Sequence, residues 1–305
     1  MAAFKDSVYD AVETPLPAIA SHERAMSTAI DEANEWLETD GSGGFASGTV
    51  AGARTRRYHA LLSTARKPPA DRVVLVNGVD VSLQTRDGSF PLTTQSYQPG
   101  VLHPDGMRHV QRFSNEPWPT WQYQLPDGTR VEHELFVTRE SSCVVLTWRL
   151  AGPRKDAELV VRPFFSGREL DAPHRENAAF DFEPHPADGT VSWRPYPSLP
   201  RVVAATTGVY THRPGWYRNF LYSGESARGL DDTEDLATPG LFTLWFDDRG
   251  EAMLILAAET LPASLSPRHL AQTLREQESA RRRGYATPLH RAADQYLVRR
   301  GEGLR

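Results

Sequence analysis

The sequence is poor in cysteine, in basic residues and in long apolar runs. Its 305 residues contain one cysteine, Cys143, so no disulfide can form within the chain, which fits a reducing compartment. Its 39 acidic residues outnumber its 34 basic ones, and the net charge of −5 argues against a general nucleic-acid binder. No apolar run approaches the ~20 residues that cross a bilayer, and no secretory signal precedes residue 34. We therefore expect a cytoplasmic protein without a membrane segment.

Several catalytic and cofactor signatures are also missing. Cys143 lies in the apolar run SSCVVLTW, which favours a buried core thiol over a nucleophile. Residues 41–46 fit the loose dinucleotide pattern G-x-G-x-x-A, but no apolar strand precedes them, so a glycine corner between strands is favoured. A G-x-S-x-G elbow and the paired histidines of a zinc protease are absent. We expect no cofactor and no metal.

Alternating apolar and polar residues dominate the middle of the chain. Val131, Leu135 and Val137 share one face of residues 129–138, and Leu146 and Trp148 share one face of residues 141–150. Period two with β-branched and aromatic residues is the strand pattern. Further strands are expected at residues 157–165, 190–194, 201–206, 241–246 and 252–259. Because so many strands must pack in two layers, we predict a mainly β protein, a large antiparallel β-sandwich.

A hairpin is predicted near residue 77. The β-prone runs 72–76 and 79–83 are joined by Asn77-Gly78, a pair that suits a type I′ turn.

The two ends of the chain differ from this pattern. Residues 1–33 are weakly patterned and leave a short helix and a mobile leader open. Ser266-Pro267 predicts a helix start, and Gly284 predicts its end. Thr287-Pro288 predicts a second helix, with apolar residues at helical spacing as far as Leu297. The glycines that follow predict a linker before a further domain.

Two stretches carry side chains typical of a binding site. In residues 35–62, five glycines precede a basic and aromatic group, which would share a polar surface if it alternated along a strand. In residues 216–235, aromatic residues precede acidic ones. Aromatic rings stack on sugars and carboxylates bind hydroxyl groups, so this mixture suits carbohydrate; two carboxylates ~5–10 Å apart could also serve a glycosidase. The alternative is a solvated acidic loop beside half-buried aromatic residues.

The segment EWLETDGSGGFASGTVAGARTRRYHALL resembles the opening of the N-terminal domain of bacterial and archaeal glycogen-debranching enzymes, the amylo-α-1,6-glucosidase type. The family pattern is close to E-W-L-x-T-N-G-x-G-G-[YF]-A-S-G-T-x-x-G-x-x-T-R-R-Y-H-G-L-L. This chain has Asp40 for the usual asparagine and Ala60 for the usual glycine. Residues 217–236 and 294–300 are also similar to the family.

The resemblance implies a division of labour between domains. After the weakly patterned leader at residues 1–33, it implies a β-supersandwich at residues 34–262 and a helical linker at residues 263–305. The linker leads to an α/α-toroid domain that holds the catalytic carboxylates. This chain would then carry no catalytic residue. It would shape the substrate cleft or dock the catalytic domain, with an α-glucan such as glycogen, limit dextrin or a maltooligosaccharide as ligand.

The residues expected in substrate-binding or interdomain roles lie in the two stretches described above. They are Arg56, Arg57, Tyr58, His59, Trp216, Tyr217, Asn219, Glu225, Arg228, Asp231, Glu234 and Asp235. One alternative function is a stand-alone carbohydrate-binding or interaction module. A third is a complete small glycosidase that uses Glu225 with Asp231 or Glu234.

Overall fold

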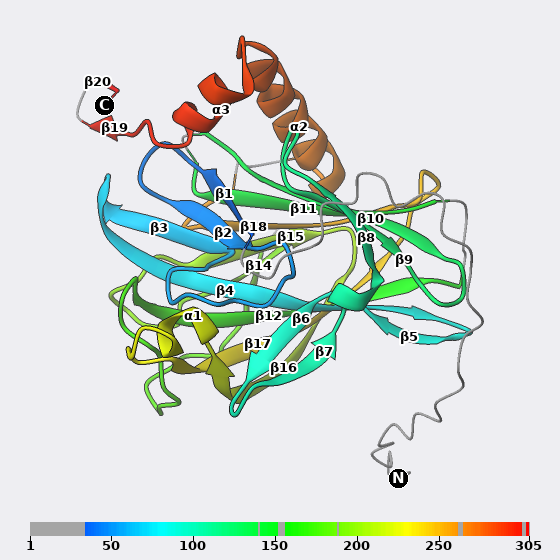
Figure 1. The fold of residues 1–305 in the computed structure, drawn as a ribbon, viewed down its shortest axis with the longest axis horizontal. Helices are drawn as coiled ribbons and strands as arrows, with labels where there is room; N and C mark the ends of the chain where they lie inside the picture. The colour runs from blue at the N-terminus through cyan, green and yellow to red at the C-terminus, as the bar shows by residue number, and fades with distance from the viewer. Residues whose placement is uncertain are drawn as a thin grey trace.

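Two antiparallel sheets packed face to face form the body of the protein (Figure 1). The computed structural model describes residues 34–139, 141–151, 156–187, 189–261, 265–300 and 303–304, so the predicted leader lies outside the described residues. The first eight-stranded sheet has the order β13 (His185–Ala187), β14 (Thr190–Trp193), β15 (Val202–Thr206), β18 (Glu251–Ala258), β11 (Cys143–Leu150), β10 (Arg130–Val137), β9 (Thr120–Gln124) and β8 (Val110–Ser114). The prediction of a mainly β sandwich is confirmed.

The second sheet carries the longest strands. Its order is β3 (Leu62–Lys67), β4 (Ala70–Thr85), β12 (Glu158–Glu169), β17 (Thr233–Trp245), β16 (Val209–Leu221), β6 (Thr94–Tyr97) and β7 (Val101–Asp105), with β5 (Gly88–Pro91) paired to β4. A short 3₁₀ turn (Met107–His109) follows β7. Two ribbons complete the strands, β1 (Glu35–Thr39) with β2 (Phe45–Thr49), and β19 (Arg299–Arg300) with β20 (Gly303–Leu304).

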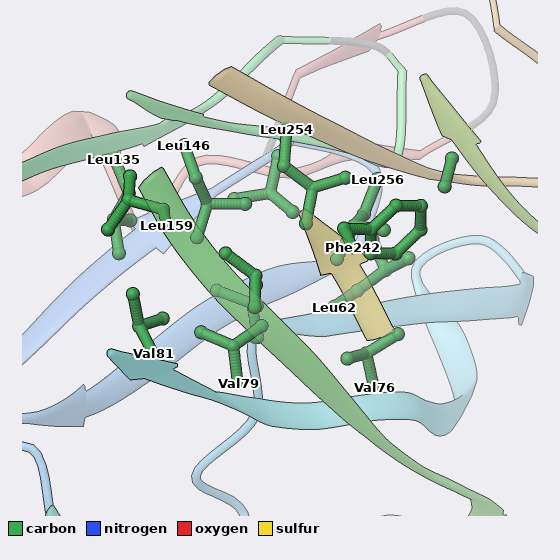
Figure 2. Close-up of a cluster of buried hydrophobic side chains, with 14 of the residues drawn as sticks. Leu62, Val76, Val79, Val81, Leu135, Leu146, Leu159, Phe242, Leu254 and Leu256 are labelled. Atoms are coloured by element: carbon green, nitrogen blue, oxygen red, sulfur yellow. The ribbon is translucent and has the colours of Figure 1, made fainter. Parts of the chain in front are cut away.

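The core lies between the inner faces of the two sheets. Leu146 and Leu254 of the first sheet lie across from Leu159 and Val81 of the second, all of them buried (Figure 2). Each such side chain contributes about 1.5–3 kcal/mol on leaving water. The alternation predicted for residues 129–138 and 141–150 is confirmed, since Val131, Leu135, Leu146 and Trp148 all lie in this core, on the paired strands β10 and β11.

The hairpin predicted at Asn77-Gly78 is wrong, because β4 runs through both residues without a turn. Strands β3 and β12 pair with β4 on its two sides, and the register with β12 shifts close to Gly78. The Asn77 amide donates to Glu234 over 3.2 Å. At Gly78 a Cβ would collide with the guanidinium of Arg54, so the missing side chain makes room for that arginine. Long-range pairing therefore overrides the local turn signal.

The glycine corner predicted at residues 41–46 is confirmed between β1 and β2. Gly41 and Gly43 have φ of 73° and 109°, which side chains rarely adopt. The Asp40 carboxylate accepts from the backbone N–H groups of Ser42 (2.7 Å) and Gly44 (2.8 Å) and closes the corner. Cys143 is buried, as predicted, and burial raises the pKa of its thiol to about 12.

Helix α2 (Pro267–Arg283) covers the outer face of the first sheet (Figure 1). Its buried residues Leu270, Ala271 and Leu274 join the apolar side chains of that face in a second core. The predicted start is confirmed, because the Ser266 hydroxyl accepts from the N–H of His269 over 3.4 Å. The predicted stop is confirmed as well, since α2 ends just before Gly284. None of the helices in the described ranges is long and apolar enough to cross a membrane.

Helix α3 (Pro288–Asp294) begins directly after its N-cap Thr287, as predicted, but ends three residues before Leu297. Its expected apolar face stays in solvent, since Leu289 is 80% and Tyr296 76% exposed. The helix is held by charge instead, because Asp294 pairs with Arg281 (2.7 Å) and with Arg139 (3.2 Å).

The end of α2 is tied to β1 by a buried ion pair. The Arg282 guanidinium donates to the Glu38 carboxylate (Nη1 to Oε1, 2.9 Å), and their side chains are 3% and 1% exposed. Burial opposes the charge on Arg282, but Glu38 and Glu278 outweigh it and raise its pKa. The helix predicted as a linker therefore packs on the sandwich along its length.

Candidate functional site

A tight turn at Arg56–His59 occupies the centre of the region that the sequence singles out. The backbone N–H of His59 donates to the carbonyl of Arg56 over 3.1 Å, so these residues form a turn and not the strand along which they could have shared one polar surface. His59 is fully buried, and its Nδ1 accepts from the N–H groups of Thr55 (3.1 Å) and Arg56 (3.3 Å). Burial, with the charges of Arg54 and Arg56, lowers the pKa of His59 to about 3. The imidazole is therefore neutral, with its proton on Nε2.

This turn holds the carboxylate of Glu35, at the start of β1. The Nε2 atom of His59 lies 3.2 Å from Oε1 of Glu35, and the Tyr58 hydroxyl donates to both oxygens at 3.3 and 3.2 Å. Burial and the nearby Glu35 raise the pKa of Tyr58, so its hydroxyl remains a donor. The Glu35 side chain is still 39% exposed. The Glu35 carboxylate is thus held by protein groups on one side and accessible to solvent on the other.

The same turn contacts helix α1 (Ser223–Ser226). The backbone N–H of Arg57 donates to Glu225 over 3.2 Å, and the Arg56 guanidinium donates to the carbonyl of Gly224 over 3.1 Å. Arg228 approaches the Glu225 carboxylate to 3.6 Å. The structure therefore brings Arg56, Arg57 and Glu225 together, although 168 residues of sequence separate Arg57 from Glu225.

A buried ion pair lies behind the turn. Glu234 is fully buried and accepts from the Arg168 guanidinium, the Tyr222 hydroxyl, the Asn77 amide (3.2 Å) and the backbone N–H of His174 (3.0 Å). Burial and the Glu234 carboxylate raise the pKa of Tyr222. Burial opposes the charge on Arg168, but attraction by Glu234 outweighs it and raises its pKa. Glu234 is therefore saturated with donors and has no contact with solvent.

Arg168 extends this pair toward the turn and toward the loop after β12. Its guanidinium donates to the backbone carbonyls of Arg57 (2.6 Å) and Leu170 (2.9 Å). The Arg57 guanidinium in turn donates to the carbonyl of Asp171 over 2.7 Å. One buried cation thus fixes the turn and the loop relative to each other.

These elements form one side of a groove of about 550 Å³. The turn contributes Tyr58, β1 contributes Glu35 and Trp36, and the loop contributes Asp171. The segment after α3 also lines the groove, and its Gln295 is anchored by Thr39 (N–H to Oε1, 2.8 Å). The first described strand and the last described segments of the chain therefore meet at this groove.

Residues 34–252 match the family model described as glycogen debranching enzyme N terminal. The chain belongs to this family.

A bacterial glucoamylase solved in complex with acarbose is similar to this family member at 8% sequence identity and a TM-score of 0.34. The match covers 88% of this chain and 35% of the glucoamylase chain, so this chain spans about a third of its length. No curated protein matches.

In this debranching-enzyme domain, the predicted aromatic residues lie apart from the groove. The Trp216 ring stacks on His174 at 5.4 Å between centroids and meets Phe180 edge-on at 5.4 Å. Tyr217 packs against Phe164 at 5.1 Å, below the guanidinium of Arg162. A histidine ring therefore covers one face of Trp216, and a guanidinium covers one face of Tyr217.

The remaining predicted residues have different surroundings. Asn219 has a φ of 61°, and its backbone N–H donates to the Asp235 carboxylate over 3.0 Å. That carboxylate also accepts from the N–H of Glu176 over 3.2 Å, so it caps backbone groups. Asp231 is exposed after α1. Across the described ranges, no group of three or more His, Cys, Asp or Glu side chains is arranged to hold a metal ion.

The sequence reasoning missed Glu35, Asp171 and Arg168. Glu35 opens the segment that resembles the family, but a single acidic residue at the start of a strand carries no local signal of a site. Arg168 lies in the part of β12 beyond residue 165, where the strand was expected to stop. Nothing near it in sequence indicates that it pairs with Glu234, 66 residues away.

Proposed function

We propose that the chain is the non-catalytic domain of a glycogen debranching enzyme that cleaves α-1,6 branches in glycogen-like α-glucans. In this proposal it forms one wall of the substrate cleft and docks the catalytic domain of the same enzyme. The observation that carries the proposal is the family match over residues 34–252. In domain terms, residues 34–262 form the sandwich, and the helices of residues 263–305 connect it to the catalytic domain.

The state of the acidic side chains supports a non-catalytic role. A glycosidase needs two carboxylates that flank the scissile bond. Glu234 is fully buried under four donors, and the Glu225 side chain is 3% exposed beside Arg57 and Arg228. Asp235 accepts from two backbone N–H groups. Only Asp231 of the predicted acids is exposed, so the predicted set does not contain an acid and base pair that faces solvent.

A hydrolysis assay tests the non-catalytic role. The purified chain is incubated with a glycogen limit dextrin, and released glucose is quantified, with a complete debranching enzyme as positive control. We expect no release above the buffer blank. Turnover that is lost in Glu225→Gln or Asp231→Asn would overturn the proposal and favour a complete glycosidase.

Reading the gene beyond codon 305 tests the connection to a catalytic domain. We expect an open reading frame that continues into a helical domain. A stop codon directly after Arg305 would instead favour a stand-alone carbohydrate-binding module.

A further inference from the structure

We propose that the groove beside β1 is an α-glucan subsite on this domain itself, in which Glu35 accepts hydrogen bonds from sugar hydroxyl groups. The sugar class rests on the proposed function, whereas the position of the site rests on the geometry of the groove. Glu35, Asp171, Gln295 and Tyr296 were not expected to bind substrate on sequence grounds, and together they define a site distinct from residues 216–235.

The size and lining of the groove suit a short oligosaccharide. Its volume of about 550 Å³ lies within the range of roughly 300–1,000 Å³ found for small-molecule sites. Aromatic rings of Trp36, Tyr58 and Tyr296 line it together with the polar side chains of Glu35 and Asp171. Rings that contact the apolar faces of a sugar, beside carboxylates that accept from its hydroxyl groups, are what an uncharged carbohydrate requires.

Glu35 is oriented more firmly than a surface carboxylate normally is. The chain of contacts starts at two backbone N–H groups, which bind Nδ1 of His59 and leave its Nε2 3.2 Å from Glu35. The Tyr58 hydroxyl donates to the same carboxylate at 3.2 Å, whereas Nε2 lies close to it without forming a hydrogen bond. Both groups are neutral, so neither offsets the negative charge of a carboxylate. A fixed, charged acceptor forms the stronger, charge-assisted hydrogen bonds with hydroxyl groups.

The groove carries charges of both signs. Glu35, Asp171 and Arg72 line it, and Arg56 lies 4.0 Å from Glu35 and also donates to the carbonyl of Gly224. Carboxylates accept hydrogen bonds and guanidinium groups donate them, so sugar hydroxyl groups, which do both, find partners of each kind there.

The walls are held in place by the rest of the fold, without a ligand. Arg57 and Arg168 fix the backbone of Asp171 and Leu170. Thr39 holds Gln295 by its N–H (2.8 Å) and its hydroxyl (3.0 Å), so only the amide nitrogen of Gln295 can serve a ligand. Preorganised walls lower the entropy cost of binding a flexible oligosaccharide.

Isothermal titration of the whole chain with maltotriose tests the subsite. We expect Glu35→Gln to weaken binding at least tenfold and Tyr58→Phe to weaken it severalfold, because the first removes the charged acceptor and the second removes a donor that orients it. Glu176→Gln is the matched control, since Glu176 is also an exposed carboxylate paired with an arginine, Arg218, and is not among the groove residues. We expect it to bind as the wild type does. Circular dichroism melts establish that all three variants fold.

Three results would overturn the subsite. Equal affinity of the wild type and Glu35→Gln would place any binding elsewhere, and loss of affinity in Glu176→Gln would place it near residues 216–235. If titration of the wild type with maltotriose gives no binding heat, the groove is not a glucan subsite and would instead be a surface for a protein partner. None of these results depends on glucose release, so a failure here is distinguishable from a failure of the non-catalytic role.

Discussion

The guanidinium of Arg168 donates to the backbone carbonyl of Arg57 over 2.6 Å, and this bond joins the buried Glu234 cluster to the turn that carries Tyr58 and His59. The cation reaches the turn only because Glu234 neutralises it inside the sandwich. A residue of β17 therefore determines, through Arg168, how the turn presents Tyr58 to the groove. The acidic residue that looked like a candidate catalyst in the sequence is a support for the candidate site.

Replacing Arg168 with methionine should destabilise the fold strongly. The variant leaves Glu234 charged and uncompensated in a fully buried position, which typically costs about 3–5 kcal/mol of unfolding free energy. Urea denaturation measures the loss. The control is Arg218→Met, which breaks the exposed pair with Glu176 and should change stability little. Equal midpoints for the two variants would contradict a structural role for the buried pair.

The neutral state of His59 should make stability depend on pH. The folded pKa, about 3, lies below the unfolded value of 6.5, so the folded state binds this proton less tightly. The stabilisation is complete above pH 6.5 and is lost as the pH falls toward 3, by about 1.4 kcal/mol per pH unit. NMR titration should find the His59 ring still neutral at pH 5.

A variant comparison isolates the contribution of His59 from that of other buried histidines. His59→Asn keeps an acceptor for the turn and removes the titrating ring, so its stability should fall less steeply with acid than that of the wild type. His185→Gln, at an exposed position on β13, should leave the slope unchanged. A ring at position 59 that titrates near 6.5 would refute the burial argument.

Removing Arg282 should release α2 from the sandwich. Arg282→Ala leaves Glu38 buried without its partner, so we expect faster amide exchange in α2 and β1 than in β12 and β17, with a loss of about 3–5 kcal/mol in unfolding free energy. Hydrogen exchange followed by mass spectrometry measures it. Arg283→Ala, one residue further and exposed, is the control. Unchanged exchange in α2 would mean that Leu270 and Leu274 hold the helix alone.

Strands with one apolar face could be predicted from the sequence because their pattern reports local burial. Residues 129–138, 141–150 and 252–259 alternate or form apolar runs, and they became β10, β11 and β18. By contrast, β16 has exposed polar residues along much of its length, so its 13 residues gave no strand signal beyond the aromatic cluster. The starts of α2 and α3 could be predicted from the sequence because an N-cap hydrogen bond joins residues only three positions apart.

The candidate site could be predicted only as two separate stretches. The turn at Arg56–His59 and the helix at Glu225 each attracted notice, but their contact depends on the long β strands between them. The partners of Glu35 are 21 to 24 residues away, and the partner of Arg57 is 168 residues away. The burial of an acidic side chain depends on strand pairing between distant segments, which the sequence does not show. Glu234 was therefore predicted in the same set as the exposed Asp231.

Gly78 shows most directly how distant contacts override a local signal, and its substitution tests that reading. In Gly78→Ala the new methyl group meets the Arg54 guanidinium, which itself donates to Gln95 over 2.9 Å, so we expect a loss of about 1–3 kcal/mol in unfolding free energy. Gly215→Ala is the matched control in β16, because open space surrounds that position and alanine is favoured over glycine in a strand interior.

A double-mutant cycle separates this clash from a turn requirement. If the methyl group collides with Arg54, the cost of Gly78→Ala should shrink in an Arg54→Ala background, since the obstructing side chain is gone. If residue 78 instead needed the positive φ of a type I′ turn, the cost would be the same in both backgrounds, because Arg54 plays no part in backbone strain. Chemical denaturation of the four proteins measures the coupling. Additive costs would instead indicate that Asn77-Gly78 forms a hairpin turn. Such a turn is incompatible with the continuous strand β4 that places Asn77 next to Glu234.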